Sequence, residues 1–404
     1  MELTSEERAI LAGTHGEAQR RALAYQIEVG RFWGAKRFVP VTSVHMMGDI
    51  EVMGDGGLAW LKEEADLGAR CRVATTTNAR CVDFAHCDRL GQDPGEVAKE
   101  REIIACLRRM DVVTTDTCIN YQTVYQPHLG EHVAWGDTGT VIYANSVFGA
   151  RSNFESGPAA LAAALTGRTP EYGFHLDEHR RATFTVELDA ELKDLADWGA
   201  VGKLVGESHQ DYFAVPVFHG FQRTPTADEL KHLGAALASY GSMGMFHFVG
   251  VTPEAPSQLP AEKIVIGERE IQSVYAGYKL GDGDARLVVF SGPQQSLFEM
   301  KKLADLFHGR KVQGSCFVTT NGAVLAQSRD LGYAHTLEKA GVTILQGVCF
   351  YILQNLSPMR EKNGWTNMVS NSAKIVNIIG AHRFNTILRR TADCVEIACS
   401  GQLK

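Results

Sequence analysis

The chain has 404 residues, 45% hydrophobic and 22% charged, which is typical of a folded globular protein and excludes a disordered or collagen-like chain. Forty basic and 47 acidic residues give a net charge of −7, so neither nucleic acid nor an anionic membrane is expected as a partner. Nine cysteines without dense spacing predict free thiols in a reducing compartment. The start MELTSEERAI lacks the basic and apolar blocks of a signal peptide, so we expect a cytoplasmic protein.

Short apolar runs alternate with helical stretches through the first half of the chain. The runs of strand length are Arg37–Val44, Arg70–Thr75 and Asp111–Thr115. Such alternation predicts an α/β fold with parallel sheets flanked by helices. A weak candidate for a domain boundary lies near Arg180–Gly206. It divides the chain into two approximate lobes, 1–195 and 196–404.

The second half continues the same pattern. The uncharged stretch Leu233–Pro253 is about as long as a membrane span, but its glycines and the capping box of Thr226 and Glu229 favour a helix that ends at Gly241. A buried strand, Met243–Val251, should follow. Further expected strands are Ala285–Phe290, Ser315–Thr319 and Val342–Leu345, with helices from Ser296 to Gly309 and over Leu325–Ala340.

Three cysteines lie beside predicted strands or apolar runs. Cys118 follows MDVVTT, Cys349 follows VTIL, and Cys394 precedes VEIA. Ligands of open α/β sheets collect beyond the carboxyl ends of strands, so these thiols are candidates for chemistry. Taken singly, each is more often a buried small hydrophobe, because free cysteine is among the most buried residue types. The sequence contains no P-loop, dinucleotide-binding, zincin, nucleophile-elbow or Cys-x-x-Cys motif. The nucleotide-binding, zinc-protease and hydrolase functions that such motifs indicate therefore have no support.

The segment Glu131–Leu176 is unusually rich in small and amide residues. Gly149, Ser152 and Asn153 would let the backbone approach a ligand, and the planar fork of Arg151 could hold a carboxylate. The alternative is a glycine-rich connection that carries a surface arginine.

Several motifs, in order along nearly the whole chain, resemble the aconitase X family. They are ANSVFGARSNFESGP, followed by LTGRTPEYG, together with LTSEERAILAGTHGEAQRRAL, TDTCINY, PTADELKHLGAALASYGSMGMFHFVGVTPEAP and VSNSAKIV. The resemblance implies an aconitase-like fold, with several parallel or mixed sheets in two to three lobes around a central cleft. It also implies a hydro-lyase whose iron–sulfur cluster is held by cysteines. The implied substrate is a small hydroxy acid, either cis-3-hydroxy-L-proline or mevalonate 5-phosphate.

The implied cluster ligands are Cys118, Cys349 and Cys394, because three thiolates leave one iron open to bind a leaving hydroxyl. Arg151 and Lys374 are candidates for the substrate carboxylate, although Lys374 could be a solvated lysine at a capped helix start. Neutral hydrogen bonds are expected from Asn145, Ser146, Asn153, Ser370 and Ser372. By position after a predicted strand, Glu254 is an acid/base candidate. His247 on that strand could face the pocket or be a core histidine.

The sequence also departs from the family pattern. It has no small swivelling domain, so it reads as the large subunit over residues 1–404, with a separate small subunit expected to carry the base serine. Where relatives have Gly-Cys-Pro-His this chain has Ser291 to Gln294, and where they often have Asp-Thr it has Gly347 and Val348. The cluster type and ligand set therefore stay open, with Cys394 or Cys316 available to complete it.

Three functions remain from the sequence. The leading one is the large subunit of a cis-3-hydroxy-L-proline dehydratase, the second is a mevalonate 5-phosphate dehydratase, and the third is a cluster-free binding homologue.

Overall fold

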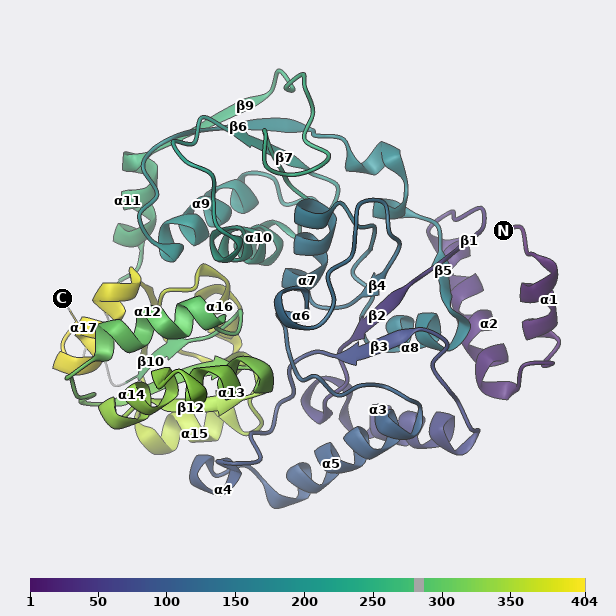
Figure 1. Ribbon diagram of the computed structural model, residues 1–404, viewed down its shortest axis with the longest axis horizontal. Coiled ribbons are helices and arrows are strands. Elements are labelled where there is room, and N and C mark those ends of the chain that lie inside the picture. Colours follow the sequence, from purple (N-terminus) through teal and green to yellow (C-terminus); the bar gives the residue numbers. More distant parts are fainter. Residues whose placement is uncertain (280–286, 404) are drawn as a thin grey trace.

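The structure, a computed structural model, describes residues 1–279 and 287–403. Three consecutive parts of the chain each build their own parallel sheet, and we call them the first, second and third units (Figure 1). The predicted α/β class, with parallel sheets flanked by helices, is confirmed.

The first unit contains a three-stranded parallel sheet in the order β3-β2-β4. Its helices cover this sheet, and α8, which is almost entirely buried, packs on β2 and α2. A separate antiparallel pair, β1 with β5, ties the start of the unit to its end. The elements are α1 (Ser5–Leu11), α2 (Glu17–Phe32), β1 (Phe38–Pro40), β2 (Ser43–Met46), α3 (Ile50–Asp66), β3 (Ala74–Thr77), α4 (Cys87–Leu90), α5 (Pro94–Arg109), α6 (Asn120–Thr123), β4 (Ala134–Trp135), α7 (Thr138–Tyr143), the π-helical turn η1 (Ala144–Phe148), α8 (Gly157–Thr166) and β5 (Arg168–Pro170).

The second unit contains a four-stranded parallel sheet in the order β8-β7-β6-β9. Its two long helices, α9 and α10, pack against each other beneath the sheet in Figure 1. They approach closely because glycines meet: a Cβ on Gly206 would lie 2.9 Å from the backbone nitrogen of Gly241. The elements are β6 (Phe184–Asp189), α9 (Leu195–Ser208), β7 (Pro216–His219), α10 (Ala227–Gly241), β8 (His247–Phe248), β9 (Lys263–Gly267) and α11 (Glu268–Gly277).

The third unit contains a five-stranded parallel sheet in the order β12-β11-β10-β13-β14. Because the strands are parallel, all of their carboxyl ends lie along one edge of the sheet. The elements are β10 (Leu287–Phe290), α12 (Leu297–Phe307), β11 (Ser315–Thr320), α13 (Gly322–Asp330), α14 (Tyr333–Ala340), β12 (Thr343–Gln346), α15 (Leu356–Asn363), β13 (Asn367–Ser370), α16 (Ala373–Ile378), β14 (Asn385–Leu388) and α17 (Thr391–Ser400).

The structure differs from the predicted elements at a few points. Asp111–Thr115 forms only a single bridge, Thr76 to Val113, since Asp111 has φ of 65° and Val113 is 60% exposed. The strand expected over Met243–Val251 shortens to β8. The helix expected over Leu325–Ala340 is broken at Gly332, whose φ of 79° separates α13 from α14. Of the strand predicted from Ala285, residues 285 and 286 lie outside the described residues.

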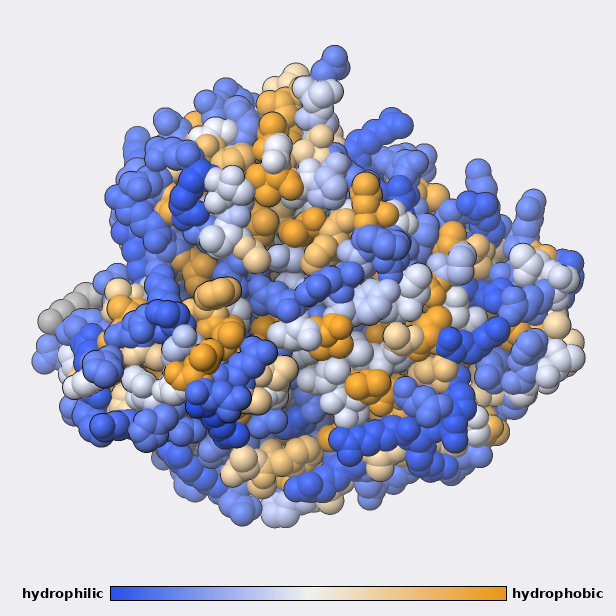
Figure 2. Space-filling view, viewed as in Figure 1, coloured by the Kyte–Doolittle hydropathy of each residue, from blue (hydrophilic) through white to orange (hydrophobic). Residues whose placement is uncertain are grey.

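One buried apolar cluster joins the three units. It includes Trp135 of the first unit, Phe248 of the second and Val289 of the third. Figure 2 shows a mostly hydrophilic rim with apolar side chains gathered toward the middle of this face. Among the described residues, no helix has both the length and the apolar character needed to cross a membrane.

Candidate active site

Two buried thiols, Cys118 of the first unit and Cys349 of the third, meet where these units pack together. Cys118 precedes α6, Cys349 follows β12, and they are 4% and 3% exposed. The neighbouring Cys118 thiol, together with the charge of Lys374, holds the pKa of Cys349 below its ordinary value. The structure therefore brings together two of the three thiols that the sequence predicted as ligands.

Gln294 connects the two loops that carry the thiols. Its side-chain Oε1 accepts from the Cys118 backbone nitrogen at 3.3 Å, and its own backbone N–H donates to Cys118 Sγ at 3.2 Å. Its Nε2 donates to the carbonyl oxygens of Val348 and Asp116, each at 3.2 Å. One amide side chain from the loop after β10 thus connects the backbones of both cysteine loops. In the sequence, Gln294 is recognisable only as a departure from the family pattern.

A buried ion pair lies beside the thiols. Lys374, at the start of α16, places Nζ 3.2 Å from Oδ1 of Asp137, which caps α7. Burial acts to lower the pKa of Lys374, but the charges of Asp137, Cys118 and Cys349 outweigh it and the pKa is raised. Lys374 therefore stays cationic next to the thiols, as its predicted role with a carboxylate requires.

The loop that precedes Lys374 is fixed by serines. Ser372 caps α16 by accepting from the Ile375 backbone nitrogen at 3.3 Å, and it donates to the carbonyl oxygen of Gly292. Ser370 Oγ accepts from the Ser372 backbone nitrogen at 3.1 Å. Both predicted residues therefore lie near the site, with hydrogen bonds to the main chain.

His45, which the sequence analysis did not single out, is fully buried on β2. Its Nδ1 lies 2.8 Å from Thr76 Oγ1, and its Nε2 has no hydrogen-bond partner among the described residues. Burial lowers the pKa of His45 to about 4, against the opposing charge of nearby Asp137, so the ring is neutral. A buried polar atom left without any partner costs about 1–3 kcal/mol, so this nitrogen is a candidate for contact with a bound molecule.

Asn120 and Tyr121, directly after the Cys118 loop, carry further buried polar atoms of this kind. Both amide atoms of Asn120 and the hydroxyl of Tyr121 have no partner in the described part of the chain. Tyr121 also lines a cavity of about 440 Å³ together with Tyr143, Phe148, Asp228 and Phe298. Three α6 residues line this cavity, and neither Cys118 nor Cys349 does.

Another group of predicted residues lies where the first and second units meet, with hydrogen bonds that join loops. Asn145 Nδ2 donates to the carbonyl oxygens of Ser152 and Gly244 at 2.9 Å, and Ser146 Oγ accepts from the Phe246 backbone nitrogen at 2.9 Å. Asn153 likewise spans to Tyr172, Phe174 and Tyr212.

The predicted cation Arg151 lies in the same region. It donates to the carbonyl oxygen of His175 at 2.8 Å and pairs with Asp177, whose side chain is 80% exposed. Its substrate-binding role, like that of Asn145, Ser146 and Asn153, stays a prediction.

Glu254 and His247 meet at Arg180. Glu254 forms an ion pair with Arg180, whose side chain is only 3% exposed, and His247 Nε2 lies 2.8 Å from the Arg180 carbonyl oxygen. Burial lowers the pKa of His247, which keeps the ring neutral. The structure therefore places both predicted acid/base residues around a buried arginine, and their contacts are not with the thiols.

Cys394 lies on α17 in the apolar core of the third unit. It is fully buried in the cluster that contains Cys316 and Val395, and its Sγ donates to the carbonyl oxygen of Arg389 at 3.5 Å. Burial raises the pKa of this thiol well above its ordinary value. This placement argues against the predicted grouping of Cys394 with Cys118 and Cys349, because the α17 position follows from helix packing against the sheet.

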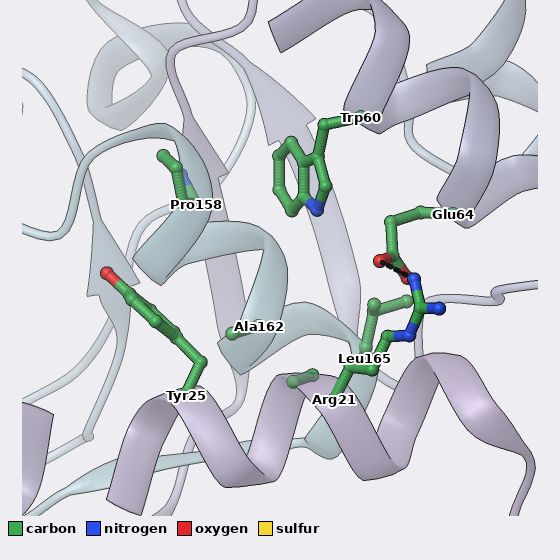
Figure 3. A pocket seen from close by; sticks show the side chains of 8 residues that line it. Arg21, Tyr25, Trp60, Glu64, Pro158, Ala162 and Leu165 are labelled. Atoms are coloured by element: carbon green, nitrogen blue, oxygen red, sulfur yellow. Dashed lines mark ion pairs between the residues drawn. The ribbon is translucent and has the colours of Figure 1, made fainter. Parts of the chain in front are cut away.

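A further cavity of about 420 Å³ lies between α2, α3 and α8 (Figure 3). Tyr25 and Trp60 stand on opposite sides of it, and Glu64 lies 3.8 Å from Arg21 at one end. None of the predicted site residues lines it.

Known proteins are similar to this chain over nearly its whole length. The aconitase X first, second and third domain models match residues 1–178, 182–276 and 285–400, which follow the three units. The phosphomevalonate dehydratase large subunit of Methanocaldococcus jannaschii is 34% identical over 93% of this chain and 94% of its own. The cis-3-hydroxy-L-proline dehydratase of Pseudomonas aeruginosa is 32% identical over 98% of this chain and 70% of its own.

The solved structure of Thermococcus kodakaraensis aconitase X in its holo-form superposes with a TM-score of 0.88 at 31% identity, covering 98% of this chain and all of that one. The three domain models, the relatives matched over almost the full chain and this superposition together show that the chain belongs to the aconitase X family.

Proposed function

We propose that the chain is the large subunit of an iron–sulfur-dependent hydro-lyase that removes water from a small hydroxy acid. The observation that carries the proposal is the buried group of Cys118, Cys349, Lys374 and Asp137, with the free Nε2 of His45 near it. Relatives named as dehydratases support the reaction class.

The residues present fit a cluster at the thiol pair. Thiolates are the protein ligands that such clusters use, and a backbone N–H aimed at Cys118 Sγ is a donor that suits a metal-bound sulfur. Within the described residues, no group of three His, Cys, Asp or Glu side chains could hold a metal, so these two thiols leave ligand positions to other atoms. A bound cluster would supply a Lewis acid for the leaving hydroxyl.

The chain's own residues have separable tasks. Lys374 binds the substrate carboxylate, and its buried position makes that charge pair stronger than it would be in water. His45 keeps the Nε2 lone pair toward the site if Nδ1 holds its proton for Thr76, so it can accept or return a proton. Ser370 and Ser372 hold the loop from which Lys374 projects.

We place cis-3-hydroxy-L-proline first among the substrates. Lys374 and Asp137 present a cation and an anion side by side, which complements the carboxylate and the ring ammonium of this zwitterion. Among the described residues, both cations beside the thiols, Lys374 and Arg80, already have a carboxylate partner. A phosphorylated substrate would need additional positive charge.

Mevalonate 5-phosphate is the second candidate. It is favoured by four relatives, named phosphomevalonate dehydratase large subunit, that are 33–34% identical over 92–100% of this chain. Their names also support a separate small subunit, which we propose carries the swivelling domain and a base serine. The nine free cysteines are consistent with a cytoplasmic setting.

The test is an assay of the chain co-produced with its small subunit and purified without oxygen. We expect stoichiometric iron and sulfide, and loss of water from cis-3-hydroxy-L-proline, followed by mass spectrometry of the product. Turnover of mevalonate 5-phosphate alone would replace the first substrate by the second. Protein that binds no iron after reconstitution and turns over neither substrate would favour a cluster-free binding homologue.

A further inference from the structure

We propose that Ser291 supplies the third protein ligand of the metal centre, beside Cys118 and Cys349. This inference rests on the proposed function, because it presupposes a cluster at the thiol pair. Ser291 follows β10 and Cys349 follows β12, so both lie at the carboxyl edge of the same parallel sheet. The Ser291 side chain is fully buried, and its Oγ lies 3.8 Å from Cys349 Sγ.

The two atoms are hydrogen-bonded in this structure, and their spacing also suits two ligands to one ion. Two donors bound tetrahedrally to the same metal, with bonds of about 2.0–2.3 Å, lie roughly 3.5–3.8 Å apart. Ser291 Oγ and Cys349 Sγ therefore need little movement to share an iron. Two protein donors on one iron is the arrangement of a [2Fe–2S] centre, so the hydroxyl oxygen would stand beside the Cys349 thiolate on the same iron.

The surroundings of Ser291 suit an oxygen that has lost its proton. Thr319 Oγ1 donates to Ser291 Oγ at 2.7 Å, and the Phe350 backbone nitrogen donates at 3.2 Å. An alkoxide oxygen has three lone pairs, so two accept these hydrogen bonds and the third remains for the metal. The hydroxyl proton leaves to solvent as the metal–oxygen bond forms, as with other protein ligands that deprotonate on binding.

The neighbouring positions cannot take this role. Gly292 has φ of +61°, and a Cβ there would lie 3.1 Å from Cβ of Ile375, so a side chain at 292 would be strained. Gln294 is already committed to the two cysteine loops. Lys374, whose charge acts on both thiols, offsets the negative charge of a third anionic ligand.

The experiment uses the full chain, reconstituted with ferrous iron and sulfide without oxygen, in four forms: wild type, Ser291→Ala, Ser291→Cys and Ser328→Ala. Ser328 is the matched control, since it is a fully buried serine on α13 without a hydrogen-bond partner among the described residues. The readouts are iron and sulfide per chain, resonance Raman and visible spectra, and the rate of iron release to a chelator. Circular dichroism establishes that each variant is folded.

We expect Ser291→Ala to release iron about 10–100-fold faster than wild type, the scale on which outer partners of metal ligands already act. Ser291→Cys should retain iron, with shifted sulfur-to-iron charge-transfer and iron–sulfur stretching bands because a sulfur replaces an oxygen. Wild-type release and bands in both variants would overturn the assignment. If Ser291→Ala does not fold, the bands of Ser291→Cys decide alone. Wild-type protein without iron would instead overturn the proposed function together with this inference.

Discussion

Lys374 and Asp137 form an ion pair shielded from solvent, with Nζ 3.2 Å from Oδ1 and side chains only 5% and 6% exposed. The pair joins α16 of the third unit to α7 of the first. It therefore links the alignment of the two units to the charge next to the thiols.

Asp137→Asn keeps the helix cap of α7 but leaves Lys374 buried without its counter-ion. We expect the free energy of unfolding to fall by about 3–5 kcal/mol, the usual cost of removing one partner of a buried pair. Denaturant unfolding measures it. The double variant Asp137→Asn with Lys374→Met should recover part of the loss, and equal losses in the single and double variants would contradict the coupling.

His45→Gln tests the imidazole as a proton carrier. Gln conserves the polar character of the position but cannot exchange a proton, so kcat should fall about 10²–10⁴-fold while iron content stays unchanged. Steady-state assays with the small subunit present measure the effect. Thr76→Val, which removes the partner of Nδ1, should give a smaller loss. Unchanged kcat in His45→Gln would remove His45 from the chemistry.

We expect serine substitutions of the cysteines to affect iron binding differently, according to where each thiol lies. Cys118→Ser and Cys349→Ser should each lose most of the bound iron, measured by elemental analysis after reconstitution. Cys394→Ser should keep all of it, because that thiol packs in the core of the third unit and donates to the Arg389 carbonyl oxygen. Loss of iron in folded Cys394→Ser would restore this residue to the ligand set.

Because the carboxyl of Glu100 is buried, we expect the free energy of unfolding to fall as pH rises. Burial, and then the charge of nearby Asp49, raises the pKa of Glu100 from its ordinary value to about 8. Between about pH 5 and 8 the folded state keeps this proton and the unfolded state has lost it, so stability decreases across that window. Glu100→Gln should remove about 3 kcal/mol of this pH-dependent loss, read from unfolding curves at several pH values.

The matched control for that slope is Glu102→Gln on the same helix, where the carboxylate is half exposed and pairs with Lys62. Its slope should equal that of the wild type. A wild-type slope in Glu100→Gln would show that another group binds the proton.

Glu254→Gln separates a structural role from a catalytic one. The substitution leaves buried Arg180 without its carboxylate, so we expect a loss of about 1–3 kcal/mol in the free energy of unfolding. If Glu254 is structural, kcat of the Glu254→Gln variant should stay within about twofold of the wild type. If Glu254 is an acid/base residue, kcat should fall about 10²–10⁴-fold. Comparing melting and kcat on the same preparation distinguishes the two.

The fold could be predicted from local pattern because each strand and helix carries its own signal. The capping box of Thr226 and Glu229 defines α10, and the apolar runs define β10, β11 and β12. The rule that ligands collect at carboxyl ends of strands selected Cys118 and Cys349 correctly as neighbours. Cys394, which precedes an apolar run and follows no predicted strand, was grouped with them without that rule, and its place in the core depends on how α17 packs.

The rest of the site depends on contacts between distant segments. His45, Asp137 and Gln294 acquire their positions only when β2, α7 and the loop after β10 come together, and no spacing in the sequence encodes this. Asn145 and Asn153 show the same limit: amides in a glycine-rich segment predicted ligand binding, which stays a prediction, and the structure adds hydrogen bonds from both amides to neighbouring loops. A single sequence cannot distinguish these uses of an amide.

The two thiols come from loops far apart in the chain, with Gln294 between them, and this order matters during synthesis. A ribosome delivers Cys118 early, but β12 and the loop of Cys349 emerge only after most of the other strands. N-terminal units fold first, so the first unit must persist with an incomplete centre. If the pair binds the proposed cluster, iron can enter only late, after the loop of Cys349 has joined the folded thiol of the first unit.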